Sequence, residues 1–355
     1  EELTKTFIDK RASVLARGLK QDILFDTKIV DEERVMINQQ YIGHLKGLKL
    51  ELDFKSDALD ADIKSLKKAA RQNVSPEIIK RILQIIDTGL IELKDDFKIY
   101  WKKYPIAKLV SGSDYLNPQI NLIIDDMIEN DEKSKLYNYL QKWINDKIKT
   151  ELKSLLDLKN IKENNSELRA LSYHLYENNG VVKRENVSSY LKKLDQEERA
   201  KLRKIGVKFG RYHIFLFKLF KPNSVSLRIL LWKIFNEKDL NLFPPTFGLN
   251  FLEDKNNISK NFMLLCGFEK FDNFFVRIDI LERLFILILN SDKNNNEIKL
   301  IPEMLNLLGS NKENFVKLLQ KMNYKTYEKN NDIYFKYIPN KKNIRKKEKV
   351  LKTTD

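Results

Sequence analysis

The spacing of apolar residues changes several times along this chain, and that change limits the folds the sequence can adopt. Apolar residues recur with a period of two in residues 23–54, 91–110 and 119–124, which favours β-strands. They recur with a helical period in residues 3–20, 58–73 and 131–158, and Ser75 and Pro76 are expected to open a further helix at 75–87. We therefore expect an α+β fold that is predominantly helical, with a helix and a β-rich module in residues 1–130.

The two strand-rich segments of this β-module resemble each other. VMINQQYIGHLKG and KIYWKKYPIAKLVSG share a Tyr followed by an Ile, then Leu and Gly. The similarity indicates either one module built from two hairpin-like halves or a coincidence of β-favouring residues. In the second segment, Trp101 with Lys102, Lys103 and Tyr104 is either a half-exposed strand or a site for stacking and phosphate contact.

Residues 131–291 are expected to form a helical domain. Helical periodicity covers 166–178, 183–194, 195–205, 224–235 and 277–290, and the last of these is apolar enough to be central to a core. Ser166 and Asp195 are suitable N-caps for two of these helices. Gly206 and Gly210 then allow the chain to turn into one strand, with Tyr212, Ile214 and Leu216 on one face and His213, Phe215 and Phe217 on the other.

A distinctive order of elements follows in residues 292–340. The strand EIKLI precedes the helix PEMLNLLG, a second helix SNKENFVKLLQKMNY capped by Ser310, and a hairpin that turns at Asn330 and Asn331. This is the winged-helix order, in which the second helix often reads a nucleic-acid groove, although small protein-interaction domains share the shape. The residues expected to face phosphate are Lys312, Asn314, Lys317 and Lys321. Residues 341–355 are expected to be a disordered basic tail.

The positive charge of the chain is unevenly distributed. The 65 Lys and Arg exceed the 50 Asp and Glu by 15, which favours polyanionic partners or membrane surfaces. Residues 196–235 contain ten Lys or Arg against two Glu, so they hold a large share of this excess. The cations concentrated there suit a phosphate backbone. The residues we expect at such a surface are Arg199, Arg203, Lys204, Lys208, Arg211 and Tyr212.

Several kinds of chemistry have no signature in this sequence. Neither G-x-x-x-x-G-K-[ST] nor G-x-G-x-x-G occurs, so we expect no nucleotide cofactor in this chain. The single Cys266 excludes an internal disulfide and is expected to be buried, and the three histidines are too far apart for a local zinc motif. We expect no catalytic and no metal-binding residues. No apolar run approaches the length of a membrane span and no signal peptide opens the chain, which favours the cytoplasm.

Several segments also resemble a known family in the same order along the chain. They are ELTKTFIDKRASVLARGL, YIGHLKG, PIAKLVSG, RALSYHLYENNGVV, LDQEERAKLRKIGVKFGRYHIFL, LKLFKP, LLWKIF and VRIDILERL. These segments look like the C-terminal region of bacterial MgpS-like superfamily 2 ATP-dependent helicases, relatives of the mitochondrial degradosome RNA helicase. The resemblance covers residues 3 to about 284 and is strongest at 194–222. Arg211, Phe215 and Phe217 depart from the residues usual in that family, which has a small residue, Tyr and Pro there.

The resemblance implies a function for the whole protein. It implies two RecA-like motor domains on the N-terminal side, which bind ATP and Mg²⁺ and move along nucleic acid, and Glu1 in place of Met suggests that this sequence is a fragment. We expect an accessory region of an ATP-dependent helicase that binds or guides RNA or DNA. The alternative is a scaffold that docks the helicase onto a partner such as a nuclease or a ribosomal component. An autonomous metal-dependent nuclease would require carboxylates that converge in a cleft.

Overall fold

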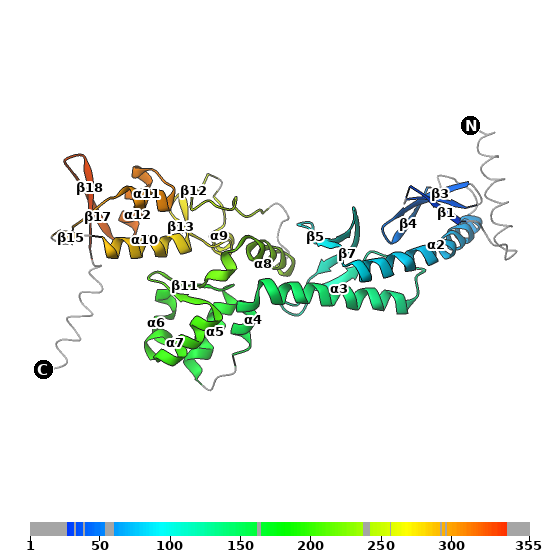
Figure 1. Ribbon diagram of the computed structural model, residues 1–355, viewed down its shortest axis with the longest axis horizontal. Coiled ribbons are helices and arrows are strands. Elements are labelled where there is room, and N and C mark those ends of the chain that lie inside the picture. The colour runs from blue at the N-terminus through cyan, green and yellow to red at the C-terminus, as the bar shows by residue number, and fades with distance from the viewer. Residues whose placement is uncertain are drawn as a thin grey trace. The chain divides into compact units, whose positions relative to one another are not determined.

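The structure is a computed structural model that describes residues 27–338 except 32, 38–39, 54–59, 162–164, 237–241, 256, 292 and 295–296. Helices alternate with several small antiparallel sheets, which confirms the predicted α+β class and the β-module near the N-terminus (Figure 1). The chain divides into two compact units: unit 1 holds Glu1–Ile148 and Leu230–Asn241, and unit 2 holds Lys149–Ile229 and Leu242–Asp355. The predicted helix at 3–20 and the predicted tail at 341–355 lie outside the described residues.

Unit 1 contains, in its described residues, two four-stranded antiparallel sheets. Each is a meander in which neighbouring strands follow one another along the chain. The first comprises β1 (Thr27–Val30), β2 (Arg34–Ile37), β3 (Gln40–Lys46) and β4 (Lys49–Leu52). The second comprises β5 (Ile91–Leu93), β6 (Lys98–Trp101), β7 (Tyr104–Val110) and β8 (Gln119–Leu122). A long helix follows each sheet: α2 (Asp60–Thr88) and α3 (Asn130–Glu151).

The two meanders share details beyond their strand order. A β-bulge shifts the register after the second residue of both β2 and β6. The backbone N–H of Leu45 donates to the carbonyl oxygen of Glu33 at 2.7 Å, and that of Leu109 donates to Phe97 at 2.7 Å in the matching place. The similarity of the two sequence segments therefore reflects a structural repeat rather than a coincidence.

Helix α2 is continuous, so the prediction of separate helices at 58–73 and 75–87 was wrong. Pro76 lies inside the helix, where its missing N–H removes one backbone hydrogen bond. The hydroxyl of Ser75 donates to the carbonyl oxygen of Arg71 at 2.8 Å, and Val74 and Ile78 are both buried. Packing before and after Pro76 thus keeps the helix in one piece.

Unit 2 repeats one order of elements three times within its described residues: a helix, a strand, one or two helices, and a hairpin. In all three sheets the strand before the inner helices pairs with the last strand of the hairpin, which is the winged-helix arrangement. The first module comprises α5 (Ser166–Glu177), β9 (Val181–Lys183), α6 (Ser188–Lys193), α7 (Gln196–Ile205), β10 (Val207–Phe209) and β11 (His213–Leu216). The middle module follows α8 (Pro222–Phe235) and comprises β12 (Phe251–Glu253), α9 (Lys260–Leu265), β13 (Phe268–Phe271) and β14 (Phe274–Arg277). The third comprises α10 (Ile278–Asn290), β16 (Glu297–Lys299), α11 (Pro302–Leu308), α12 (Lys312–Lys321), β17 (Tyr324–Lys329) and β18 (Asp332–Tyr337), with β15 (Lys293–Asn294) beside β16.

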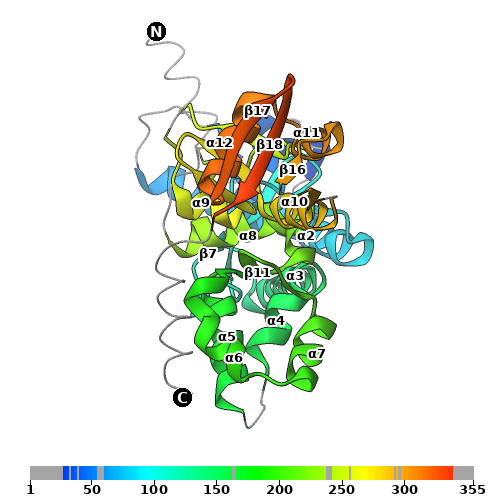
Figure 2. The same ribbon diagram turned by 90° about the vertical axis from the view of Figure 1, so that its left-hand side faces the viewer.

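The winged-helix order predicted for residues 292–340 is confirmed, and the turn lies at Asn330 and Asn331 as expected. Both asparagines have positive φ, 51° and 65°, as a tight two-residue hairpin turn requires. Figure 2 shows β17 and β18 as a long ribbon beside α11 and α12. Segment 131–291, expected to be helical, also holds the short strands of the first and middle modules.

All three modules join the last inner helix to the hairpin in the same way. The linking residue has a positive φ at Gly206 (111°), Gly267 (90°) and Asn323 (66°). This left-handed conformation ends each helix and turns the chain sharply into the strand. Glycine adopts it without strain and asparagine with little, which explains the residue types found there.

The sequence predictions for the first module hold in part. The segment predicted as a helix at 183–194 is helical from Arg184, as a 3₁₀ helix at Arg184–Val187 and then as α6 from Ser188, whereas Lys183 belongs to β9, which pairs with His213–Phe215. The strand predicted after Gly210 is β11, and the preceding strand β10, which forms a hairpin with it, was not predicted. All four residues of β11 are buried, so no face of it is exposed to solvent.

The predicted N-caps are partly right. Asp195 caps α7 in a capping box with Glu198, as predicted. Ser166 was wrong, because the side chain of Asn165 accepts the N–H groups at the start of α5. Ser310 was also wrong, because Asn311 Oδ1 accepts the N–H of Asn314 at 2.8 Å.

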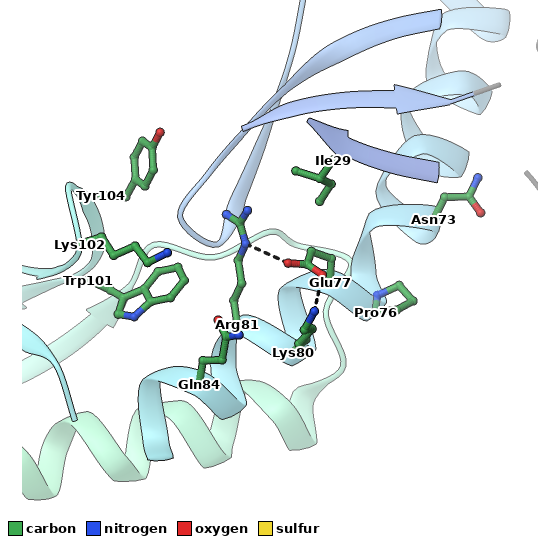
Figure 3. Close-up of a pocket in the computed structure, with 10 residues that line it drawn as sticks. All are labelled: Ile29, Asn73, Pro76, Glu77, Lys80, Arg81, Gln84, Trp101, Lys102 and Tyr104. Atoms are coloured by element: carbon green, nitrogen blue, oxygen red, sulfur yellow. Dashed lines mark hydrogen bonds and ion pairs between the residues drawn. The ribbon is translucent and has the colours of Figure 1, made fainter. Parts of the chain in front are cut away.

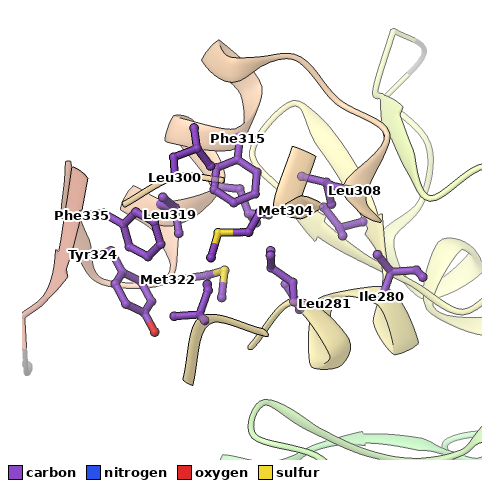
Figure 4. Close-up of a cluster of buried hydrophobic side chains, with 14 of the residues drawn as sticks. Ile280, Leu281, Leu300, Met304, Leu308, Phe315, Leu319, Met322, Tyr324 and Phe335 are labelled. Carbon is purple, nitrogen blue, oxygen red and sulfur yellow. The ribbon is translucent and has the colours of Figure 1, made fainter. Parts of the chain in front are cut away.

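The core of the third module is built around α10, as its apolar periodicity predicts. Leu281 of α10 packs with Met304 of α11, Phe315 of α12 and Phe335 of β18 (Figure 4). Leu284 of α10 belongs to the same cluster. All five side chains are buried. Cys266, next to the middle module's linking glycine, is buried as predicted.

Candidate nucleic-acid interface

Helix α7 carries three of the predicted site residues, and they have different environments. Arg199 is half-buried, and its Nη2 donates to the carbonyl oxygen of Leu191 at 2.5 Å. It therefore satisfies a carbonyl at the end of α6 and acts in folding. Arg203 and Lys204 lie in the last turn of α7 and are exposed.

The predicted residue Lys208 follows in β10 and is also exposed. The guanidinium of Arg203 lies 5.4 Å from the ring centre of Phe209, and Lys208 Nζ lies 5.2 Å from that of Phe217. Within the part of the chain that the structure describes, Arg203, Lys204 and Lys208 form no ion pair. We call these three residues the α7–β10 cations.

The turn between β10 and β11 is held by a distant carboxylate. Glu282 of α10 is buried and accepts backbone N–H groups from Arg211 at 2.5 Å, Tyr212 at 2.8 Å and His213 at 2.8 Å. A Cβ added to Gly210 would lie 2.3 Å from the carboxyl carbon of Glu282, so this position has no room for a side chain. Successive backbone N–H groups of this kind form an anion-binding concavity, and here the protein fills it with its own side chain.

His213 is buried in a network of charged groups that connects the modules. Its Nε2 lies 2.9 Å from Glu269 of β13, its Nδ1 lies 3.7 Å from Glu282, and Lys183 Nζ lies 2.8 Å from Glu269. Burial acts to lower the pKa of His213, but the hydrogen bond with Glu269 and the nearby carboxylate of Glu282 outweigh it and raise this pKa. Burial likewise acts to raise the pKa of Glu269, and the hydrogen bonds from His213 and Lys183 lower it overall. The network thus favours charged forms that neutralise one another.

Arg211 and Tyr212 lie in this turn and face the third module. Arg211 is exposed, and its guanidinium lies 5.7 Å from the ring centre of Phe285. The ring of Tyr212 meets Phe285 edge to face with their centres 5.7 Å apart, and burial raises the pKa of the Tyr212 phenol.

The predicted residues of α12 are mostly engaged with neighbours. Lys317 pairs with Glu313 at 2.7 Å, and Lys321 pairs with Asp272 at 2.5 Å. The backbone N–H of Asn314 is held by the helix cap, and its side chain is half-buried. Lys312 is exposed and forms no ion pair in the described residues. The helix of the third module therefore offers less free positive charge than α7.

Two adjoining hollows bring residues of the first and third modules together. A hollow of about 680 Å³ is lined by residues that include Lys183, Arg184, Lys192, Arg211 and Lys321. A second, of about 440 Å³, is lined largely by apolar and aromatic side chains. They share four lining residues, Arg211, Tyr212, Met322 and Asn323, so we describe them as one groove.

The groove unites only part of the predicted site. Of the predicted residues, Arg211, Tyr212 and Lys321 line it, whereas Arg199, Arg203, Lys204, Lys208, Lys312, Asn314 and Lys317 do not. Sequence reasoning missed Lys183, Arg184 and Lys192. A sequence signal was present for Lys183 and Arg184, because VVKR places two cations directly after two valines, the usual pattern of a short strand that ends at a surface.

Unit 1 has a separate hollow of about 660 Å³ beside Trp101 and Arg81 (Figure 3). Trp101 is buried, with the Arg81 guanidinium 5.9 Å and Lys102 Nζ 5.0 Å from its ring centre. Arg81 Nη1 donates to the carbonyl oxygen of Gly47 at 2.8 Å and so ties α2 to the first meander. A buried Trp101 is no platform for an incoming base, which favours the interpretation of this segment as a half-buried strand.

Two further properties of the described residues bear on function. They contain no group of three or more His, Cys, Asp or Glu side chains placed to hold a metal ion. None of their helices combines the length and the apolar character needed to cross a membrane. Comparisons of the chain with protein-family models, with curated proteins and with solved structures found no match.

Proposed function

We propose that this chain binds RNA or DNA and that the first winged-helix module makes the main contact. The observation that carries the proposal is the set of α7–β10 cations. They are exposed and form no ion pair in the described residues, and they lie where α7, the helix that reads a groove in this fold, meets the hairpin. Cations that are not already neutralised are the ones that release counterions when they meet phosphate.

We also propose a role for this binding within a larger protein. The sequence resemblance supports an accessory region that guides nucleic acid for ATP-dependent helicase motor domains, in the cytoplasm. ATP and Mg²⁺ would then bind to those motor domains, and we assign no reaction and no cofactor to the residues of this chain.

A protein-docking scaffold is the second candidate, and the third module favours it. Lys317 and Lys321 on α12 are paired with carboxylates, so this helix presents little free charge to a phosphate backbone. Winged-helix modules also serve as protein-interaction domains. In this alternative the chain would dock a helicase onto a nuclease or a ribosomal component.

Fluorescence anisotropy with single-stranded and duplex oligonucleotides across a salt series tests the proposal. We expect binding at low salt, with a logarithmic salt slope that falls by about 2 when Arg203, Lys204 and Lys208 are replaced together by Ala, because each phosphate contact to a single strand contributes about 0.7.

The matched control replaces Lys135, Lys317 and Lys329 by Ala. This variant loses the same three charges, but each of these lysines is already paired with a carboxylate, at 2.9, 2.7 and 2.8 Å. Its salt slope should stay close to that of the wild type. Absence of binding at low salt, or an equal effect of the two triple variants, would contradict the proposal and leave the scaffold as the better account.

A further inference from the structure

The aromatic part of the groove is open to solvent at its rim. Tyr337 and Leu289 are 41% and 48% exposed, whereas Tyr324 and Ile288 at its floor are buried. The rings of Tyr324 and Tyr337 meet edge to face with their centres 5.4 Å apart, and those of Tyr212 and Phe285 do so at 5.7 Å. A hollow of about 440 Å³ is within the size range in which proteins bind small ligands. Its lining combines four aromatic side chains with aliphatic ones, Met322, Asn323 and the cations Arg211 and Lys336.

The adjoining part of the groove is cationic. Five of its lining residues are Lys or Arg and two are Glu, so it favours an anion. Lys183 and Arg184 already have partners within the protein. Lys183 Nζ pairs with Glu269 at 2.8 Å, and Arg184 Nη1 donates to the carbonyl oxygen of Gly210 at 2.8 Å. Lys192 and Arg211 are exposed and form no ion pair within the described residues.

Arg211 lies where the two parts meet. It lines both hollows, and its guanidinium lies 5.7 Å from the ring centre of Phe285. A cation next to an aromatic wall fits a ligand that carries a flat ring and an anionic group side by side. A nucleotide within a single strand has both.

We propose, on the basis of the nucleic-acid binding proposed above, that this groove selects single-stranded RNA or DNA. One unpaired base enters the aromatic hollow and contacts Tyr337, while Arg211 and Lys192 bind the neighbouring phosphates. A paired base cannot enter, because its faces are already stacked between neighbouring pairs. The α7–β10 cations bind phosphate in either form, so the groove supplies the preference for single strands.

The test compares a short single-stranded oligonucleotide with a duplex of the same sequence, by fluorescence anisotropy at one salt concentration. Replacing Tyr337 by Ala should weaken binding to the single strand about tenfold, because stacking on one aromatic side chain is typically worth 1–3 kcal/mol, and should leave duplex binding unchanged. Tyr337→Phe keeps the ring and should bind like the wild type. Tyr173→Ala is the matched control, because Tyr173 is an exposed tyrosine of α5 outside the groove.

The outcomes separate this inference from the proposed function. If the wild type binds and the α7–β10 variant is impaired, but Tyr337→Ala binds both ligands as the wild type does, the base pocket is refuted and the proposed function stands. An equal loss for single strand and duplex also refutes it. If nothing binds, both fail. Should Tyr337→Ala lower the thermal unfolding midpoint, Leu289→Ser at the exposed rim gives the same comparison.

Discussion

Replacing Glu282 by Ala tests whether one carboxylate holds the turn that presents Arg211. The carboxylate accepts three backbone N–H groups at 2.5, 2.8 and 2.8 Å and lies 3.7 Å from His213 Nδ1. A hydrogen bond to a charged group typically contributes about 1.5–3 kcal/mol, and such contributions do not add fully within one cluster. Breaking a buried charged cluster by removing one partner typically costs about 3–5 kcal/mol. We expect the free energy of unfolding to fall by that amount.

Two measurements check this expectation at different levels. Urea unfolding followed by circular dichroism gives the loss of stability, and hydrogen exchange gives the protection of the amides of Arg211, Tyr212 and His213. These amides should lose protection more than amides elsewhere in the first module. Glu282→Gln should cost less, about 1–3 kcal/mol, because one amide oxygen still accepts while its NH₂ faces a backbone donor. A loss below about 1 kcal/mol in Glu282→Ala, with the three amides still protected, would refute the reasoning.

Other consequences concern pH and the linking residues. The pKa of His213 is raised above 6.5, so its stabilising charge is fully present below pH 6.5 and is lost as the pH rises through the folded-state pKa. The pKa of Glu269 is lowered below 4.5, so its contribution is present above pH 4.5 and is lost as the pH falls through the folded-state pKa. The thermal unfolding midpoint, measured against pH, should therefore be highest between pH 4.5 and pH 6.5. His213→Gln should remove its decline at higher pH. Gly206 has a φ of 111°, so Gly206→Ala should lower the free energy of unfolding by about 1–2 kcal/mol. Asn323 has a φ of 66°, and Asn323→Gly should leave this free energy unchanged or raise it slightly. Denaturant midpoints measure both effects, and equal losses would contradict the repeated helix ending.

Local sequence patterns predicted the elements that local interactions form. Asp195 and Glu198 stand three residues apart before an amphipathic stretch, and α7 begins there with the expected capping box. Asn330 and Asn331 lie between two runs of β-favouring residues, and the third module's hairpin turns there. At these two places the local sequence was sufficient to predict the structure.

Several errors arose where distant residues decide the structure, whereas those at Ser166 and Ser310 are one-residue shifts of a local helix cap. Val181–Lys183 is too short to show a period of two, and it becomes a strand only because β11 pairs with it some thirty residues later. The turn at Gly210 was predicted, but not the distant Glu282, which accepts the N–H groups beyond it. The groove could not be predicted from the sequence for the same reason, because Lys192 and Lys321 come together only through the packing of two modules. One signal of the threefold repeat was present: GVKF, GFEKF and NYKTY each follow an amphipathic stretch and begin with a residue suited to positive φ.

The three modules share one strand pairing but differ in what their last inner helix presents to solvent, and this difference bears on the proposed contact with nucleic acid. Helix α9 of the middle module is six residues long and buries Phe262, Met263 and Leu265, so its side chains serve the core. Lys260 is the cation of α9, and its Nζ lies 3.9 Å from Glu269. Glu269 also pairs with His213 and Lys183 of the first module, at 2.9 Å and 2.8 Å. The middle module thus acts as the structural partner of the first, and the proposed contacts with phosphate fall to the α7–β10 cations of the first module and to Arg211 and Lys192 of the groove.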